Sequence, residues 1–171
     1  MPTPEQDQHF LEAAIPELKD YLLSDILFWP LGAKQPRLTI GGLLLAQRRL
    51  RAQQLGEQLH PKIATLREKW RAAWERKAAK ELNARLDLWM NYLNDYRSNP
   101  ENHAINYRHE VRWRVMLELL LTDISADLVE LTTFDELLKR KLVPDKFIWN
   151  ANLENQFSQD QYWFLYGFLP G

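Results

Sequence analysis

The sequence predicts an all-α fold: an elongated helical bundle built on one long central helix, about residues 61–97, with shorter helices and aromatic-rich terminal segments packed on it. Apolar residues recur about every 3.7 positions from residue 59 to residue 96, which is the period of an amphipathic helix. Helix-start signals recur along the rest of the chain. The runs LTI and KFIW resemble strands but are too short to predict a sheet.

The composition is that of one globular domain spanning residues 1–171. Of its residues, 46% are apolar and 26% are charged, which is enough for a packed core. The absence of Cys excludes disulfides, thiolate zinc sites, iron–sulfur clusters and thiol catalysis. It fits a reducing compartment, and the acidic N-terminus lacks the order of a signal peptide, so we expect a cytoplasmic protein. No uncharged apolar run reaches the roughly 18 residues of a membrane span, so we expect no membrane partner.

The first helix is expected to begin after Thr3, because Thr3 and Gln6 have the spacing of a capping box with Pro at the first helical position. We expect this helix to run to about Ala14. Pro16 should then kink or restart it, because Pro disfavours helical geometry in the residue before it. The restarted helix is predicted to end near Trp29.

A loop rich in Pro and Gly, residues 28–42, separates these segments from the next helix. Thr39 is placed to cap that helix, which we expect over residues 43–58. Pro61 removes a backbone donor, so we expect a short break near His60 before the central helix.

The central helix has the strongest periodic pattern in the chain. Its period suits a nearly straight helix better than a left-handed coiled coil, which needs a period of about 3.5. At about 1.5 Å per residue, residues 61–97 would form a rod of about 55 Å. A compact chain of this length has a diameter of only about 40 Å. We therefore expect an elongated fold, or a second subunit that covers part of the rod.

Four segments are expected after the central helix. Residues 105–131 have the pattern of a main helix that packs against it. Residues 133–136 form a second capping box and should start a short helix that stops at residues 143–144. Residues 145–157 are loop-like with embedded aromatics. Residues 158–161 form a third capping box, which predicts a final helix at the C-terminus.

Charge is distributed unevenly. The segment 46–85 carries 11 Lys and Arg against 4 Asp and Glu, although the whole chain has a formal charge of −1. These cations either pair within the protein and lie on solvated faces, or form a surface for an acidic partner or nucleic acid. Trp70 and Trp74 fall on the apolar face of the predicted helix, so we interpret them as core residues and not as platforms for bases. The candidates for the anionic-partner or nucleic-acid surface are Arg48, Arg49, Arg51, Lys62, Lys69, Arg76 and Lys80.

The chain ends on QYWFLYGFLPG, residues 161–171, where apolar side chains would cover every side of a helix. This pattern predicts burial all round. We expect the segment to dock on the similar N-terminal segment YLLSDILFWPLG, residues 21–32, with burial in a second chain as the alternative. Because aromatic residues are enriched at interfaces, the candidate partner surface consists of Trp149, Phe157, Tyr162, Trp163, Tyr166 and Phe168.

Residues that could carry catalysis or bind a metal form no recognised arrangement. The chain has one Glu-x-x-His, Glu57 to His60, whereas di-iron bundles use two. No phosphate-binding or nucleophile motif is present. We therefore expect no cofactor or metal. The predicted function is a non-catalytic helical protein–protein interaction or assembly module that binds a protein partner or itself as a homodimer. A nucleic-acid-associated helical protein is the alternative, and an enzyme without a recognisable motif is the third hypothesis.

Overall fold

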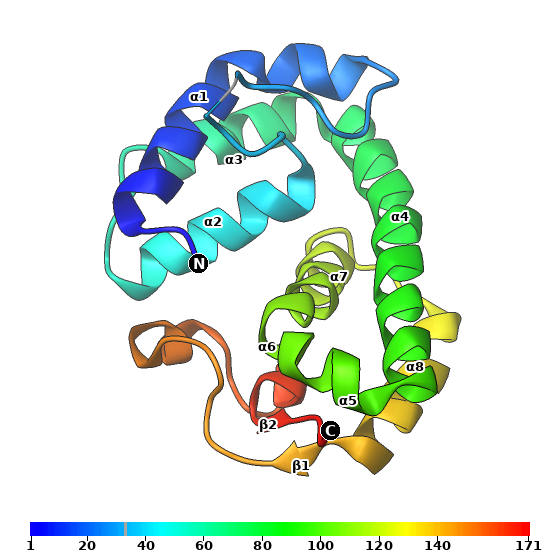
Figure 1. Ribbon diagram of the computed structural model, residues 1–171. Helices are drawn as coiled ribbons and strands as arrows, with labels where there is room; N and C mark the ends of the chain where they lie inside the picture. The colour runs from blue at the N-terminus through cyan, green and yellow to red at the C-terminus, as the bar shows by residue number, and fades with distance from the viewer. Residues whose placement is uncertain (33) are drawn as a thin grey trace. The chain divides into compact units, whose positions relative to one another are not determined.

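The computed structural model of the protein describes residues 1–32 and 34–171 (Figure 1). Over these residues the all-α prediction is confirmed: there are eight α-helices, three short 3₁₀ turns and one sheet of two two-residue strands. The chain divides into two compact units, an N-terminal unit of residues 1–81 and a C-terminal unit of residues 82–171. The sequence predicts that residues 1–171 form a single elongated domain. That depends on how the two units are joined, so it stays a prediction. Within the described ranges, none of the helices combines the length and the apolar character needed to pass through a bilayer.

The helices of the N-terminal unit are α1 (Pro4–Leu23), α2 (Ile40–Ala52), α3 (His60–Lys69) and the first turns of α4 (Arg71–Ser98). The predicted capping box at the start of α1 is confirmed. The Thr3 hydroxyl accepts from the N–H of Gln6, and the Gln6 side chain accepts from the N–H of Thr3. Thr39 caps α2 as predicted, accepting from the N–H of Gly42 at 2.9 Å.

Pro16 lies inside α1, which continues past it as one helix, so the predicted restart is wrong. The other predicted outcome, a kink, agrees with the change of direction that α1 shows along its length (Figure 1). A Pro in a helix interior costs about 3 kcal/mol, because it removes a backbone donor and crowds the preceding turn. Tertiary packing offsets that cost here, since Ala14 and Leu18 on either side of Pro16 are fully buried. The helix ends at Leu23, earlier than the predicted end near residue 29.

The connection from α2 to α3 is longer than predicted. Helix α2 ends at Ala52, before the expected residue 58, and Gln54 and Gly56 adopt positive φ angles of 57° and 79°. A left-handed residue cannot continue an α-helix, and it commonly ends one. The predicted break before the central helix is confirmed, because α3 begins at His60.

The predicted central helix is interrupted at Trp70, which lies between α3 and α4. Trp70 has φ of −114° and ψ of 36°, outside the helical region, and the chain changes direction there (Figure 1). Backbone bonds nevertheless continue across the break: the Trp70 N–H donates to Leu66, and the Trp74 N–H donates to Trp70. The apolar spacing of the sequence passes through this break unchanged, so the sequence pattern alone shows one helix.

Two charged side chains of α4 hold the ends of α1 and α2. Lys77 is buried, and its Nζ donates to the carbonyl oxygens of Ser24 at 2.6 Å and Ile26 at 2.7 Å, just beyond the end of α1. Glu81, one turn further along, is fully buried and accepts from the N–H of Gly41 at 2.9 Å. That N–H lies in the first turn of α2, where helix donors have no partner within the helix and the dipole favours an anion. Helix α4 therefore fixes both of its neighbours.

A buried ion pair joins α1 to α2. The Nε and Nη2 atoms of Arg49 donate to the two carboxylate oxygens of Asp7, both at 2.7 Å. Asp7 is buried and Arg49 nearly so. Bidentate geometry makes this a strong hydrogen-bonded pair, and removing one partner would leave a buried charge uncompensated.

The C-terminal unit contains the rest of α4 and a series of short elements. They are α5 (Pro100–His103), η1 (Ala104–Asn106), α6 (Tyr107–Glu110), α7 (Arg112–Asp123), α8 (Val129–Lys141), β1 (Val143–Pro144), η2 (Ala151–Gln156), η3 (Trp163–Leu165) and β2 (Gly167–Phe168). The predicted main helix over residues 105–131 is therefore wrong in extent. It is divided before α7, and Ser125 with φ of 51° lies after the end of α7. Helix α8 begins at Val129, so Thr133 lies inside it and does not cap it.

The C-terminal tail is not the predicted helix. The capping box of residues 158–161 starts no α-helix, and the chain instead forms η3 and then β2. Strand β2 pairs antiparallel with β1, with Val143 opposite Phe168, which corrects the prediction of no strands. A Cβ on Gly167 would lie 2.6 Å from the carbonyl oxygen of Val143, so only Gly fits where these strands approach.

The helices of the same unit cover the tail. Phe164 is fully buried. The Tyr107 hydroxyl donates to the carbonyl of Phe164 at 2.6 Å, and the Tyr96 hydroxyl donates to that of Pro170 at 2.7 Å. The tail is thus part of its own unit's core. Its predicted docking on residues 21–32 would join the two units and stays a prediction.

A buried arginine ties α7 to α8 and to the tail. Arg114 donates two hydrogen bonds to Asp135, at 2.9 and 2.8 Å, and one to Glu118 at 2.9 Å. Its guanidinium carbon lies 4.4 Å from the ring centre of Phe164. Breaking a buried pair of this kind typically costs about 3–5 kcal/mol, so α8 and the tail are held firmly against α7.

We predict that Lys77→Met lowers the free energy of unfolding by about 2 kcal/mol or more, because two part-buried carbonyl oxygens lose a charged donor. Urea denaturation followed by circular dichroism measures the change. Lys80→Met, at an exposed position of the same helix, is the matched control and should change stability by less than about 0.5 kcal/mol. An equal loss in both variants would contradict the role given to the buried ammonium.

Candidate partner-binding groove

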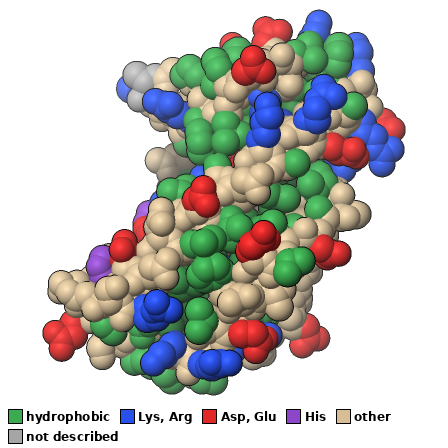
Figure 2. Space-filling model, turned by 90° about the vertical axis from the view of Figure 1, so that its right-hand side faces the viewer, with side chains coloured by type: hydrophobic (Ala, Val, Ile, Leu, Met, Phe, Trp, Pro, Cys, Tyr) green, Lys and Arg blue, Asp and Glu red, His purple; other side chains and the backbone are tan. Residues whose placement is uncertain are grey.

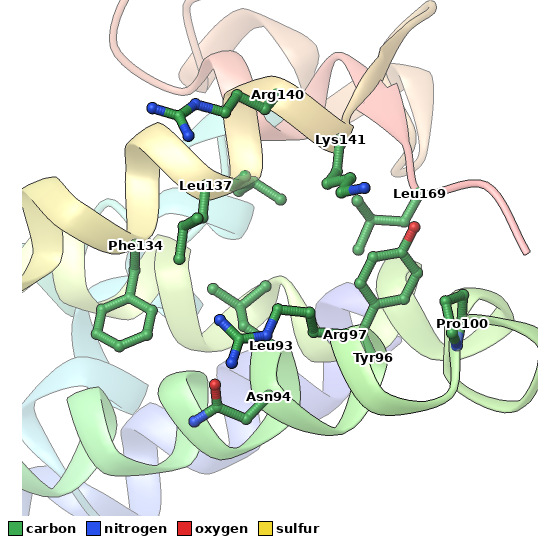
Figure 3. Close-up of a pocket in the computed structure, with 11 residues that line it drawn as sticks. Leu93, Asn94, Tyr96, Arg97, Pro100, Phe134, Leu137, Arg140, Lys141 and Leu169 are labelled. Carbon is green, nitrogen blue, oxygen red and sulfur yellow. The ribbon is translucent and has the colours of Figure 1, made fainter.

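An apolar groove lies in the C-terminal unit between the last turns of α4 and α8 (Figure 3). Its volume is about 230 Å³. A dry protein cavity of about 150 Å³ can hold one benzene molecule, and pockets for drug-sized ligands measure about 300–1,000 Å³. The groove therefore suits a few apolar side chains. Its apolar lining consists of Leu93, Tyr96, Pro100, Phe134, Leu137, Leu138 and Leu169.

Three segments of the chain build the groove. Helical spacing of three residues puts Leu93 and Tyr96 on one face of α4, and Phe134 and Leu137 on one face of α8. The tail supplies Leu169, which follows β2 directly. The Tyr96 hydrogen bond to the residue after Leu169 holds that side chain in place.

Three cationic side chains border the groove. Arg97 comes from α4, whereas Arg140 and Lys141 come from α8, across the groove (Figure 3). All three are exposed, and none has an ion-pair partner in the part of the chain that the structure describes. Figure 2 shows Lys and Arg side chains around hydrophobic surface at the lower end of this face of the C-terminal unit. Apolar walls with cations at the rim would complement an apolar ligand that carries acidic groups.

The six aromatic residues predicted as a partner surface lie at different depths. Three are buried in the C-terminal unit: Trp149, Phe157 and Tyr162. Hydrogen bonds hold two of these residues inside the unit. The indole N–H of Trp149 donates to the carbonyl of Arg108 at 2.9 Å, and the hydroxyl of Tyr166 donates to the carbonyl of Phe157 at 2.6 Å. Trp163 and Tyr166 are half-buried, and Phe168 is 44% exposed. Of the six predicted residues, only Trp163, Tyr166 and Phe168 therefore remain candidates for a contact surface.

The basic residues predicted as an anionic-partner surface fall into two groups. Arg49 is bound to Asp7, and Arg48 is half-buried. The pKa of Arg51 is lowered by burial and by the neighbouring charge of Arg48. The exposed members of the set are Arg51, Lys62, Lys69, Arg76 and Lys80.

The tryptophans of this segment are core residues or lie at its edge. Trp74 is fully buried, and Arg67 lies 5.7 Å from its ring centre. Trp70 is half-buried, and the ammonium groups of Lys19 and Lys69 lie 5.4 and 5.7 Å from its ring centre. The interpretation as a core residue is therefore confirmed for Trp74, whereas Trp70 lies at the edge of the core with charged side chains over its ring.

His60 uses both ring nitrogens within the protein. Its Nε2 lies 3.1 Å from the carbonyl oxygen of Leu55, and its Nδ1 lies 3.2 Å from the side-chain nitrogen of Gln47. A carbonyl only accepts and an amide NH₂ only donates, so a neutral ring protonated on Nε2 satisfies both partners. Burial is the largest cause that lowers the pKa of His60 below its ordinary value of 6.5, and Arg51 lowers it further. Across residues 1–32 and 34–171, no three metal-binding side chains gather into a site.

Sequence reasoning missed the groove because its walls come from segments far apart in the chain. The one local signal is the run Lys139-Arg140-Lys141 at the end of the short helix predicted there. The run itself does not indicate that Arg97 lies across the groove from it, or that Leu169 is part of the groove lining. Such a juxtaposition depends on the path of the tail, which the sequence predicted as a helix.

Comparison with known proteins gives no family for the chain: no family model matches it, and no match is found among curated proteins or solved structures. Its function therefore has to be inferred from the geometry and charge of the groove.

We predict that His60 makes stability depend on pH. The pKa of His60 is lower in the folded protein than in the unfolded chain. The unfolded chain therefore binds a proton more readily, and acid favours unfolding. The contribution of neutral His60 to the free energy of unfolding is fully present above about pH 6.5 and is lost as the pH falls through the pKa of His60 in the folded protein. Urea denaturation between about pH 7.5 and pH 5 should show a steeper loss of stability in the wild type than in His60→Gln. His9→Gln, at an exposed position of α1, is the control and should follow the wild-type profile. Parallel profiles for the wild type and His60→Gln would refute the prediction.

Proposed function

We propose that the protein is a non-catalytic interaction module whose C-terminal unit binds an apolar, acidic segment of a partner protein in the groove between α4 and α8. The observation that carries the proposal is the combination of an apolar floor with three cations free of ion pairs among the described residues, Arg97, Arg140 and Lys141. Exposed apolar patches with polar rims are typical of interaction sites on soluble proteins.

The shape of the groove favours a helix as the bound segment. Two helices form its walls, and an amphipathic partner helix can place apolar side chains at positions i, i+3 and i+4 into such a groove. Acidic residues on the flanks of that helix would then face Arg97 on one side and Arg140 and Lys141 on the other. Rim charges of this kind mainly raise the association rate and select the partner, while apolar burial supplies most of the affinity.

The size of the groove sets the strength of binding. A volume of about 230 Å³ accommodates only a few side chains, so the buried area is at the low end for protein interfaces. Such small interfaces are typical of transient complexes. We therefore expect reversible binding with a Kd in the micromolar range or weaker.

We predict that a designed helical peptide with Leu at positions i, i+3 and i+7 and Glu elsewhere binds the groove. Chemical-shift changes at Leu93, Leu137 and Leu169 in NMR spectra would locate it. The same peptide with Lys in place of Glu should bind at least about tenfold more weakly, because each close charge contact contributes on the order of 1 kcal/mol. The variant Arg97→Glu/Arg140→Glu should reverse the preference between the two peptides.

The control for this experiment is Arg108→Glu/Lys146→Glu, which reverses two exposed charges of the same unit away from the groove. It should bind both peptides as the wild type does. If the acidic peptide binds neither the wild type nor the control, or shifts residues outside the groove, the proposed function is wrong.

A second function, nucleic-acid binding, is favoured by the exposed cations of the N-terminal unit, Arg51, Lys62, Lys69, Arg76 and Lys80. None of the five has an ion-pair partner in the described part of the chain. Nucleic-acid binding ranks below partner binding at the groove for two reasons. The segment uses Arg49 and Lys77 internally, and Arg71 lies near Glu68 and Glu75.

If nucleic acid binds, we predict that log Kobs for duplex DNA falls linearly with log salt concentration. The slope is about −0.9 for each phosphate neutralised, so five cations set a limit of about −4.5. Fluorescence anisotropy with a labelled duplex measures it, and Lys62→Glu/Lys69→Glu should flatten the slope by about 2. Absence of binding at about 50 mM salt would eliminate this function.

A further inference from the structure

We infer that the partner of the groove is a second copy of this chain, whose α1 tip docks between α4 and α8. The α1 tip consists of Asp20, Leu23, Asp25 and Ile26. The inference rests on the proposed function of the groove and names the occupant.

The α1 tip combines exposed apolar side chains with exposed carboxylates. Leu23 is 54% exposed and Ile26 is 48% exposed, an unusual degree for two large aliphatic residues so close together. Asp20 and Asp25 are exposed on either side of Leu23, and neither forms an ion pair within the residues that the structure describes. The tip therefore has the chemistry that the groove selects.

The backbone of the α1 tip is held rigidly. The Nζ of Lys77 donates to the carbonyl oxygens of Ser24 and Ile26. The hydroxyl of Tyr21 donates to the carbonyl of Leu27 at 2.9 Å, and the hydroxyl of Ser24 donates to that of Tyr21 at 2.8 Å. A pre-organised tip loses little conformational freedom on binding, which favours association through a small contact.

The tip and the groove are complementary in size and charge. Two aliphatic side chains three residues apart match the few that a groove of about 230 Å³ can hold. The carboxylates of Asp20 and Asp25 have the charge that complements the three cations, Arg97 on one wall and Arg140 and Lys141 on the other.

Charge also favours approach at long range. The N-terminal unit has 13 Lys and Arg against 10 Asp and Glu, whereas the C-terminal unit has 9 against 13. The N-terminal unit of one copy is therefore attracted to the C-terminal unit of the next. At shorter range the local charges of tip and groove fix the orientation.

The tip and the groove are different surfaces, and each copy offers one of each. Two copies that exchange tips close a two-fold dimer, whereas a one-way contact leaves a free tip and a free groove to which further copies can add. In both cases assembly should grow with protein concentration.

The test begins with light scattering and sedimentation velocity from about 10 to 500 µM, a range that covers transient contacts. The mean mass of the wild type should rise from the 20.3 kDa of one chain to about twice that value or more. The tip variant Leu23→Ser/Ile26→Ser and the groove variant Arg97→Glu/Arg140→Glu should each stay monomeric. Circular dichroism melting checks that both fold, which is expected because all four side chains are exposed.

Mixing the two variants gives the sharper test. The tip variant has an intact groove and the groove variant has an intact tip, so a 1:1 mixture can make one contact and no more. We expect a discrete heterodimer of two chains, with no growth beyond it. An interface that does not pair the tip with the groove would not be restored in this way.

The matched control is Asp127→Lys/Glu130→Lys, which reverses two exposed carboxylates beside the exposed side chain of Val129. It should assemble as the wild type does. The inference is overturned if the wild type remains monomeric up to 500 µM, if the tip variant assembles like the wild type, or if the control alone abolishes assembly. Binding of the acidic peptide to a strictly monomeric protein would keep the groove's proposed function and remove the second copy as its occupant.

Discussion

The structure depends on one constraint: irregular segments bring backbone carbonyls into the interior, and each buried carbonyl needs a donor. Helices satisfy their own carbonyls, but the segment after α1 and the C-terminal tail cannot. Buried side chains on the helices supply the missing donors. In the N-terminal unit Lys77 serves Ser24 and Ile26. In the C-terminal unit the hydroxyls of Tyr107 and Tyr96 bond to the carbonyls of the tail.

The same constraint produces the two surfaces to which we assign function. The α1 tip exists because Lys77 holds a non-helical turn in a fixed shape, which leaves its aliphatic side chains in solvent. The groove exists because Tyr96 holds the end of the tail against α4, so Leu169 lies on its floor. Aromatic rings that the sequence suggested as contacts instead form the interior that supports the groove, as Phe157 does. Trp149, Phe157 and Tyr162 thus stabilise the scaffold. The candidate contact surfaces consist of aliphatic and charged side chains together with the groove residues Tyr96 and Phe134.

Local signals in the sequence predicted what is decided locally. The caps at Thr3 and Thr39 were predicted correctly, because capping needs only a side-chain oxygen at the right spacing. The break at Trp70 was not predicted, since the apolar spacing passes through it unchanged. The sequence predicted a kink or a restart at Pro16 without deciding between them, because the packing that keeps α1 continuous comes from other helices. The prediction of a helix in the tail was wrong for the same reason, because the turns of the tail depend on hydrogen-bond donors from distant residues. The candidate groove, built from three distant segments, therefore could not be predicted, although its cationic run could be read from the sequence.

The groove is complete without its occupant, and this has a consequence for regulation. Leu169 and Leu138 are buried by their own unit, so the floor does not need a partner to form. A ligand that binds only the folded state stabilises it by RT ln(1 + [L]/Kd), which is about 0.4 kcal/mol when its concentration equals Kd. Transient binding therefore adds little to the stability of the unit. Because the rim is charged and exposed, changes in salt or in a partner's charge would alter the proposed association, while the buried network around Arg114 and the tyrosines would remain intact.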